Sequence, residues 1–454
     1  MNHRAMKATA MEKMPANPLF PAGEMRKEGA YAWYVVYLLT FAYTVAFIDR
    51  QVLNLLVDPI KRDLLLSDVQ ISLLQGLAFM TAYVLFGPLF GRWVDTGNRR
   101  NVLALGVALW SCCTVLCGMS SQFWQLFLAR AGVGAAEACL APAGFSLIAD
   151  YFSRKHLPRA MSIFMLGPSL GAGLALIAGG LVIASAPTLG RWLPILSGLS
   201  TWQLTFVMVG APGMLLALLL LTIREPARTT VSGSAGTDQH YTLRETLAFF
   251  WANRPFYLRY FLGLSLLAIV IYGFPTWMPA HLMRHFGADP SSVGLRYGTQ
   301  VLILGAIGIY SGPWIERWFS ARACRDAPVR VPMLCAGVVA LLCAVFPFAD
   351  SLGSALVVAG AINLFYCLPW AVAASALQIS TPNRMRGVAV SIFYFLISLF
   401  GLGIAPSIIA FVTDRVLRDP ARVGISLAVV CATSALGACW LLYGAMKHYP
   451  KNVE

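Results

Sequence analysis

The sequence predicts an all-α, polytopic membrane protein with twelve transmembrane helices, arranged as two pseudo-symmetric six-helix halves with both termini in the cytoplasm. Of its 454 residues, 58% are hydrophobic and 12% are charged, whereas about 25% are charged in an ordinary globular protein. Twelve apolar runs approach or exceed the ~20 residues that a helix needs to cross the hydrocarbon core. Basic residues gather in every second loop, as expected when those loops face the cytoplasm.

The apolar runs give the bounds of the predicted spans in chain order. They cover residues 31–57, 69–91, 101–119, 122–148, 160–183, 202–223, 255–280, 292–315, 331–348, 353–379, 387–412 and 423–446. Proline and glycine inside several runs are compatible with helices, because neighbouring helices satisfy the freed backbone groups. The first run is too long for the core of a signal peptide and has no clear cleavage site, so we expect it to remain in the mature protein.

The distribution of charge predicts the orientation. The chain carries 34 Lys and Arg against 20 Asp and Glu, a formal net charge of +14. With the N-terminus in the cytoplasm, 24 of these basic residues lie in cytoplasmic segments and 8 in outer loops. This asymmetry accounts for the excess charge without a nucleic-acid partner. Anionic membrane lipids are then a secondary partner of the basic loops.

The longest polar stretch divides the chain into two halves of six spans. We expect a cytoplasmic N-tail, an N-terminal bundle, a cytoplasmic linker, a C-terminal bundle and a cytoplasmic C-tail at residues 1–30, 31–223, 224–253, 254–446 and 447–454. The linker contains residues 231–237 (VSGSAGT), a composition typical of flexible linkers. Residues 91–95 (GRWVD) and 312–316 (GPWIE) follow the second and eighth spans, which indicates a duplication. Duplicated parallel halves are typical of transporters that rock around a central site.

Several motifs resemble those of the major facilitator superfamily. Residues 91–100 (GRWVDTGNRR) resemble its signature between the second and third spans, although Thr96 and Asn98 depart from the common form. Residues 130–134 (RAGVG) resemble its Arg-x-x-x-Gly motif, and residues 167–171 (GPSLG) resemble its Gly-Pro motif. The resemblance implies the major facilitator fold and transport by alternating access.

Four segments are similar to the Spinster family within that superfamily. They are residues 47–54 (FIDRQVLN), 73–78 (LLQGLA), 132–137 (GVGAAE) and 149–152 (ADYF). Animal Spinster proteins are known as proton-linked lysolipid and sphingosine-1-phosphate transporters. The resemblance therefore implies a proton-coupled transporter of amphipathic, lipid-like molecules. The many arginines and few lysines favour a bacterial member in the inner (plasma) membrane, and we expect a monomer.

Four ionisable residues lie well inside the predicted spans, all in the first half: Asp49, Arg50, Arg130 and Glu137. Their formal charges cancel. Ionised groups at bilayer depth are costly, so they usually face a cavity and pair with one another. At 1.5 Å per residue, Asp49 and Arg130 each lie about 12 Å from the outer ends of their spans, which allows a contact. Glu137 follows Arg130 by nearly two turns, so both face the same way.

These four residues form the predicted proton-coupling site. We expect Asp49 and Glu137 to bind and release a proton, while Arg130 changes its partner as the two halves rock. Arg50 has three candidate partners, which are Glu137, Asp49 and an anionic substrate headgroup. The alternative is a static group of ion pairs that only holds the first and fourth spans together.

A second charged group lies at the cytoplasmic end of the second span and forms the predicted gate. By analogy with the superfamily, Asp95 closes the cytoplasmic side in the outward-facing state by bonding to a helix N-terminus in the other half. Arg99 and Arg100 belong to the same gate. The alternative for Asp95 is an acid in a solvated turn.

The predicted substrate site combines the charged first half with an apolar second half. Its candidates in the second half are rings and one amide inside spans, namely Tyr272, Trp277, Asn363, Tyr366, Trp370, Phe393 and Tyr394. From these we assign Tyr272, Trp277, Asn363, Tyr366 and Tyr394, together with Arg50 and Glu137, to substrate binding. Such a wall suits an amphipathic ligand with its headgroup at the charges and its acyl chain along the rings. The alternative is that the rings only pack or lie at interfaces.

Other classes of protein lack support in the sequence. No glycine is followed by lysine, so there is no phosphate-binding loop, and no H-E-x-x-H motif is present. His281 and His285 are four residues apart, but no acid or cysteine nearby completes a metal site. We therefore expect no enzyme activity, no metal and no cofactor other than a proton gradient. A drug/proton antiporter or an organic-anion/proton symporter of the same fold stays open, and so does a non-transporting membrane sensor.

Overall fold

The computed structural model describes residues 29–153, 156–192, 198–226, 243–322, 324–382 and 385–449. In these ranges twelve helical segments are long and apolar enough to cross a membrane, which confirms the predicted twelve-span architecture. The helix of the seventh span continues beyond the end that the sequence predicts, residue 280. Helix α13 (Arg254–Phe286) continues until Gly287, whose φ of 64° stops it. Polar residues stay helical beyond the apolar run until a residue adopts the left-handed conformation.

The first half contains six spans, and several of them are built from more than one helical segment. Its elements are α2 (Ala30–Gln51), η1 (Val52–Leu55), α3 (Val57–Asp63), α4 (Asp68–Ser72), η2 (Leu73–Leu77), α5 (Ala78–Thr96), α6 (Arg99–Gly118), α7 (Phe123–Glu137), α8 (Leu140–Tyr151), α9 (Leu157–Phe164), α10 (Leu166–Trp192) and α11 (Thr201–Leu220). The short helix α3 connects the first two spans on the outer side, where the sequence predicts a loop.

The second half repeats this plan. Its elements are α12 (Leu243–Ala252), α13, α14 (Pro290–Ser320), α15 (Ala327–Val345), η4 (Phe346–Phe348), α16 (Leu352–Cys367), α17 (Pro369–Ser380), α18 (Arg386–Ile397), η6 (Ser398–Ile404), α19 (Ala405–Phe411), η7 (Val412–Leu417), η8 (Pro420–Arg422) and α20 (Val423–Lys447). Helix α12 lies within the predicted linker, residues 224–253. The segment expected to be flexible, residues 231–237, falls outside the described residues.

Wide helical turns occur in both halves. Segment η2 in the second span and η6 in the eleventh span are both π-helical. Gly76 of η2 packs directly against η6, since a Cβ at this position would lie 2.2 Å from the carbonyl oxygen of Leu402. Because π-helical turns often occur at functional sites, this crossing point marks a place where helix geometry is adapted.

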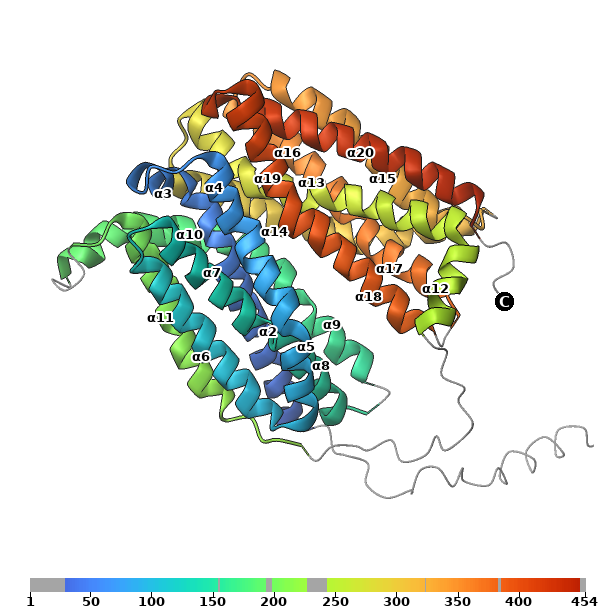
Figure 1. Cartoon of the computed structure of the whole chain (residues 1–454), viewed down its shortest axis with the longest axis horizontal. Helices are drawn as coiled ribbons and strands as arrows, with labels where there is room; N and C mark the ends of the chain where they lie inside the picture. Colours follow the sequence, from blue (N-terminus) through green and yellow to red (C-terminus); the bar gives the residue numbers. More distant parts are fainter. Residues whose placement is uncertain are drawn as a thin grey trace, which may run out of the picture.

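The two halves form separate groups of helices (Figure 1), and several pairs of elements join them. Helix α4 contacts α19, and α10 contacts α14. Glycines allow the close approach of α10 and α14, because a Cβ on Gly294 would lie 2.3 Å from the carbonyl oxygen of Leu176 and 3.0 Å from the Cα of Gly180. Both contacts lie toward the side that the charge distribution assigns to the outside of the cell.

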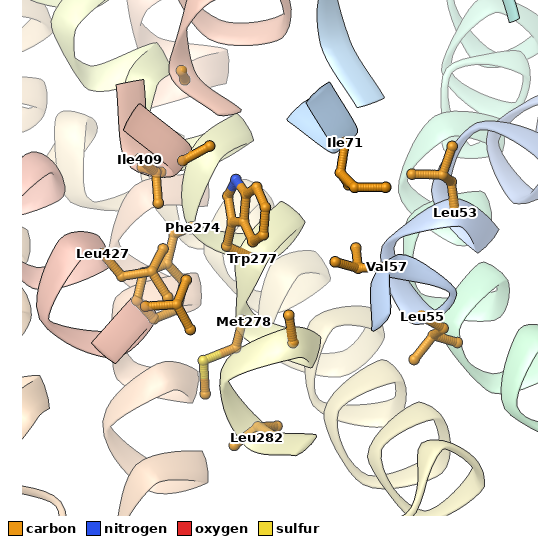
Figure 2. Packing of buried hydrophobic residues seen from close by; sticks show 14 of the residues in the cluster. Leu53, Leu55, Val57, Ile71, Phe274, Trp277, Met278, Leu282, Ile409 and Leu427 are labelled. Atoms are coloured by element: carbon orange, nitrogen blue, oxygen red, sulfur yellow. The ribbon is translucent and has the colours of Figure 1, made fainter. Parts of the chain in front are cut away.

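A continuous apolar core joins the halves on this outer side. Figure 2 shows Trp277 of α13 between Ile71 of the first half and Ile409 of the second. Leu53 and Val57 extend the same core toward the first span. Each of these five side chains is at most 1% exposed. The outer side is therefore closed by close-packed side chains, as in the interior of a domain.

Candidate transport site

Arg50 and Glu137 form a buried ion pair between the first and fourth spans. Arg50 Nη2 lies 2.5 Å from Glu137 Oε2, and the Glu137 side chain is 2% exposed. The Arg50 guanidinium also lies over two rings, 4.6 Å from the centroid of Phe47 and 4.1 Å from that of Phe79. Of the three candidate partners that the sequence offers Arg50, the structure shows contact with Glu137.

The Asp49 carboxylate is bound by a hydroxyl group. Thr114 Oγ1 on α6 donates a hydrogen bond to Asp49 Oδ2, while Asp49 Oδ1 has no partner among the described residues. Thr114 was not predicted from the sequence, because a hydroxyl inside a helix usually bonds to its own backbone. The same Thr114 hydroxyl lies 3.0 Å from the carbonyl oxygen of Trp110, so its one hydrogen is shared between two acceptors.

Arg130 is fully buried, and backbone oxygens hold its charge. Its guanidinium donates to the carbonyl oxygens of Leu74, Asp49 and Arg50 at 3.5, 3.4 and 3.4 Å. Leu74 belongs to the π-helical η2, and residues 49 and 50 lie just before the 3₁₀ segment η1. Carbonyl groups near such irregular turns can accept bonds from side chains. The expected side-chain contact between Asp49 and Arg130 is replaced by this arrangement.

We call Asp49, Arg50, Arg130 and Glu137 the charged cluster. Its two acids and two bases are buried or nearly so, and their formal charges cancel. In each acid, one carboxylate oxygen has a hydrogen-bond partner. The other oxygen, Asp49 Oδ1 in one acid and Glu137 Oε1 in the other, has no partner among the described residues. A proton can therefore add to either acid without first displacing a hydrogen bond, although protonated Glu137 would hold Arg50 less strongly.

Two neighbouring cavities share wall residues, and the smaller of them adjoins the charged cluster. The larger has a volume of about 270 Å³, and its walls come from both halves, including Phe47, Ser169, Ile271 and Trp370. The smaller has a volume of about 30 Å³ and is bordered by Arg50, among others. The larger cavity is mainly apolar with a few polar groups, which is typical of sites for small molecules.

The predicted substrate-binding residues of the second half fall into two groups. Tyr272, Asn363 and Tyr366 line the larger cavity, as does Trp370. Trp277 lies instead in the outer core, where its Nε1 donates to the carbonyl oxygen of Pro406 at 3.0 Å. Tyr394 is 56% exposed and borders neither cavity, and Phe393 is packed in a core cluster of the second half.

Three amide side chains at the cavities were missed in the sequence. Gln51 and Asn54 border both cavities, and Gln75 borders the smaller one. They lie within the two segments, residues 47–54 and 73–78, that carry the family resemblance. Uncharged amides inside consecutive spans are themselves a signal, because a polar group in hydrocarbon needs a partner.

Arg284 closes the outer side with ion pairs between the halves. At the end of α13, its side chain contacts Asp58 at 2.7 Å and Asp68 at 2.8 Å, both in the first half. Lys61 also contacts Asp68, at 2.8 Å. From the sequence these residues were counted only as loop charges, because nothing in their order indicates pairing across more than 200 positions.

Two further polar contacts join the halves on the same side. Asp414 Oδ2 on η7 accepts a hydrogen bond from the backbone N–H of Val69, in the first turn of α4, at 2.9 Å. One turn further, Ser72 Oγ lies 3.1 Å from Ser407 Oγ. A carboxylate at the first turn of a helix is favourable because the N–H groups there lack partners within the helix.

The predicted cytoplasmic gate residues lie in three different surroundings. Asp95 is exposed. Arg99 is 2% exposed and forms ion pairs with Asp150 and, at 2.7 Å, with Glu225. The Arg100 side chain contacts only the side chain of Asn101 among the described residues, at 3.0 Å. In this state Arg99 holds the cytoplasmic ends of the third, fourth and sixth spans together within the first half.

His281 and His285 stack with ring centroids 5.3 Å apart at the outer end of α13. His281 is buried against Phe346, and His285 is exposed. Within the described residues, no group of three or more His, Cys, Asp or Glu side chains is placed to hold a metal ion.

Comparisons with known proteins agree with this architecture. The Major Facilitator Superfamily pattern matches residues 39–406. An MFS-type efflux pump of Mycolicibacterium smegmatis is 28% identical over 91% of this chain and 93% of its own. Human protein spinster homolog 1 is 28% identical over 85% of this chain and 74% of its own.

A solved structure shares the arrangement of the spans. It is the crystal structure of a bacterial homologue of the human lysosomal transporter Spinster, in an inward-facing and unoccupied conformation. The TM-score is 0.77 at 27% identity, and the match covers 94% of this chain and 97% of the other. The outer closure described above agrees with an inward-facing arrangement. The chain is thus an integral membrane protein of the Major Facilitator Superfamily, and within that superfamily of transporters it resembles the Spinster type.

Proposed function

We propose that the protein is a proton-coupled secondary transporter of amphipathic, lipid-like molecules of the lysophospholipid or sphingoid phosphate class. Asp49 and Glu137 act as the proton sites, and Arg130 is the partner that switches between states. The observation that carries this proposal is the buried Arg50–Glu137 ion pair, whose Arg50 borders a small cavity that shares wall residues with a mainly apolar cavity of about 270 Å³.

The ion pair supplies a physical reason for coupling. An anionic headgroup that binds Arg50 competes with Glu137 for the same guanidinium. A carboxylate released from its partner in apolar surroundings is costly, so Glu137 takes up a proton when the headgroup arrives. Substrate and proton then bind together, and departure of the substrate returns Glu137 to Arg50 and releases the proton.

Arg130 acts in the outward-facing state, where it becomes the partner of the Asp49 carboxylate. In the inward-facing arrangement its guanidinium is held by three backbone oxygens, and the Asp49 carboxylate is bound by Thr114. Arg130 already contacts residue 49, because its Nη1 donates to the Asp49 carbonyl oxygen at 3.4 Å. A modest change in the turns around η1 would exchange that carbonyl contact for a contact with the carboxylate, which would hold Asp49 ionised.

A second candidate function rests on the relatives. The M. smegmatis relative is an MFS-type efflux pump, which favours export of drug-like amphiphiles in exchange for protons. The mainly apolar wall of the larger cavity suits such compounds as well. The direction of coupling distinguishes the two candidate functions. In symport the substrate moves in the same direction as the proton, and in antiport it moves in the opposite direction.

The test uses purified protein in liposomes with an imposed pH gradient. Proton flux is recorded while lysophospholipids, sphingoid phosphates, drugs and organic acids are added. Asp49→Asn and Glu137→Gln should lose proton-dependent transport but stay folded in detergent, with the elution volume of the parent. Asp326→Asn, which removes an acid paired with Arg330 outside the predicted spans, is the matched control and should transport normally.

Normal pH dependence in both the Asp49 and the Glu137 variant would contradict the proposal and leave the static cluster as the explanation. Counterflow distinguishes the remaining class. A carrier exchanges labelled substrate across the membrane against a gradient, whereas a sensor or channel does not.

A further inference from the structure

The beginning of α13 lies beside the end of α20 on the inner side of the second half (Figure 1). Basic side chains from both helices meet there. Arg259 lies in the second turn of α13, and Lys447 and His448 lie at the end of α20. Arg259 Nη1 is 3.3 Å from His448 Nδ1. We call Arg259, Lys447 and His448 the inner basic patch, and the proposed transport mechanism does not use it.

A glycine of α20 makes room for Arg259. A Cβ at Gly444 would lie 2.9 Å from Arg259 Cδ and 3.2 Å from Arg259 Nε, so the arginine side chain lies directly over this glycine. Arg259 Nη1 also donates to the carbonyl oxygen of Pro255, in its own helix, at 2.8 Å. Contacts from two helices thus hold the guanidinium in one place.

The Lys447 ammonium lies at the same level of α20 as the Arg259 guanidinium. Its Nζ is 4.3 Å from the centroid of the Tyr443 ring, and Tyr443 directly precedes Gly444 in the helix. Two positive charges therefore lie beside one short stretch of α20, residues 443–444.

No acid neutralises these two charges. Arg259 and Lys447 form no ion pair with an Asp or Glu in the part of the chain that the structure describes, whereas Arg284 and Arg330 do. His448 Nδ1 lies 2.9 Å from the carbonyl oxygen of Gly444, a contact in which the ring nitrogen donates, so it offers no lone pair to Arg259. The patch keeps positive charge and N–H donors available for an anion.

The helix dipole accounts for only part of this arrangement. Cations at the end of a helix are favourable, which suits Lys447 and His448. Arg259 lies near the beginning of α13, where the dipole gives a cation no stabilisation. An anion bound between the two helices accounts for all three residues.

The surroundings of the patch are those of the boundary between water and hydrocarbon. Tyr443 is exposed, and Trp440, about one turn before Gly444, is 74% exposed. Leu436 lies one turn further along the same side of α20 and is exposed as well. Tyrosine and tryptophan gather at the level of the lipid headgroups in membrane proteins. An acyl chain can lie along Leu436 and Trp440 while its headgroup reaches the patch, and a soluble anion would use none of this apolar surface.

We propose that the inner basic patch binds the headgroup of an anionic phospholipid of the inner leaflet, with one acyl chain along Leu436 and Trp440. The loop charges predict only a diffuse attraction to such lipids, whereas here two helices hold two cations at one place. The inference goes beyond the proposed function, because it does not depend on what the central cavities carry. Gly444 is a positioning residue, which acts through Arg259.

The test compares two lipids that share their acyl chains and differ in headgroup charge. Native mass spectrometry of the full chain in detergent, titrated with phosphatidylglycerol or phosphatidylcholine, gives the dissociation constant of the first bound lipid. Phosphatidylglycerol should bind about tenfold more tightly, because each basic residue near an anionic lipid changes the binding constant about fivefold. This comparison needs no variant, so it does not depend on how a variant folds.

Variants then locate the site. Arg259→Gln and Lys447→Gln should each lower the preference for phosphatidylglycerol about fivefold and leave binding of phosphatidylcholine unchanged. Gly444→Ala should also lower the preference severalfold although the net charge stays the same, because the added methyl group displaces Arg259. Elution volumes equal to that of the parent show that the variants are folded.

Arg317→Gln is the matched control. Arg317 is an exposed arginine at the end of α14 on the same side of the membrane, and its Nε donates to the carbonyl oxygen of Pro313, four residues earlier, at 3.2 Å. Arg259 makes the corresponding bond to Pro255, but no basic side chain of another helix contacts Arg317 among the described residues. The preference for phosphatidylglycerol should therefore stay within twofold of the parent value.

Equal affinity of the parent protein for the two lipids would overturn the inference. An equal loss of preference in Arg317→Gln and Arg259→Gln would do the same, since it would show an effect of general surface charge. Displacement of phosphatidylglycerol by excess inorganic phosphate would identify a soluble anion as the occupant and contradict the lipid assignment. An unchanged preference in Gly444→Ala would contradict the position given to Arg259.

Discussion

The guanidinium of Arg284 binds both carboxylate oxygens of Asp68 across the boundary between the two halves. Nη1 donates to Oδ2 and Nη2 donates to Oδ1, each at 2.8 Å. The Asp68 side chain is fully buried. A two-pronged pair of this kind fixes geometry as well as charge. Because its members belong to different halves, the pair exists only while the outer side is closed.

Removal of Arg284 should therefore favour the outward-facing state. Breaking a buried pair costs about 3–5 kcal/mol when the remaining charge is uncompensated. Lys61 remains beside Asp68 and partly compensates its charge, so the cost for Arg284→Gln is smaller. We expect a shift of about 1.4 kcal/mol, which changes the equilibrium constant between the inward-facing and outward-facing states tenfold. Hydrogen exchange measured by mass spectrometry should show faster exchange in peptides covering residues 66–74. Arg296→Gln, an exposed arginine at the outer part of the eighth span, is the control, and equal exchange in both variants would refute the prediction.

Glycines that allow close contact between the halves should not tolerate a methyl group. A Cβ at Gly294 would lie 2.3 Å from the Leu176 carbonyl oxygen, and one at Gly76 would lie 2.2 Å from that of Leu402. Gly294→Ala and Gly76→Ala should each destabilise the outer-closed state by about 1–3 kcal/mol, the usual cost of overpacking. The readouts are melting temperature and hydrogen exchange at the outer ends of the spans. Gly91→Ala, where a Cβ would meet nothing within 4 Å, should leave both unchanged.

Asp414 and Asp95 should have opposite effects on the conformational equilibrium. Asp414 holds the first turn of α4 from the other half. Asp414→Ala should lose a cap contact of about 0.5–2 kcal/mol and favour the outward-facing state. Asp95→Ala should favour the inward-facing state, because Asp95 is exposed there. Hydrogen exchange of the peptide containing Val69 distinguishes them, and a shift in the same direction would contradict the assignment.

Arg99 and Arg100 should differ sharply although they are adjacent. Arg99→Ala leaves Asp150 and Glu225 without this cation, so we expect a loss of about 3–5 kcal/mol in the stability of the first half. Arg100→Ala should change stability by less than about 0.5 kcal/mol, because its side chain contacts only Asn101 in the described part of the chain. Thermal unfolding in detergent checks both. Similar melting temperatures for the two variants would rule out a structural role specific to Arg99.

Most of the architecture could be predicted from the sequence, because the bilayer constrains each helix locally. Crossing a bilayer imposes a length and an apolar composition on each helix, and insertion imposes a bias of basic residues on its flanks, so both can be read locally. The charged cluster could be found in the same way, because ionisable residues at bilayer depth are rare. Its members Arg50 and Glu137 do meet. The cost of burying a charge thus predicts that a partner exists. It did not predict which of the three candidates pairs with Arg50, and the structure shows that the partner is Glu137.

Features that depend on how helices are rotated and paired could not be read from the sequence. Trp277 lies on a helix that is apolar around most of its circumference, so its pattern does not tell a cavity wall from a packed core. The Arg284–Asp68 pair joins positions more than 200 residues apart, and Arg130 is held by carbonyl oxygens, which every residue has. Gln51, Asn54 and Gln75 were missed as well, although they can be recognised in the sequence as polar groups inside spans.

The cancellation of charge within the charged cluster has an electrical consequence. A membrane potential of 100 mV acts on one elementary charge with about 2.3 kcal/mol when that charge crosses the whole membrane. Asp49 and Glu137 balance Arg50 and Arg130, so an empty carrier that rocks with all four ionised transfers no net charge from this site. One bound proton makes the site positive, and the anion that accompanies it restores neutrality. The voltage would then leave both the empty and the fully loaded carrier nearly unaffected and would act mainly on a carrier that holds a proton without its substrate.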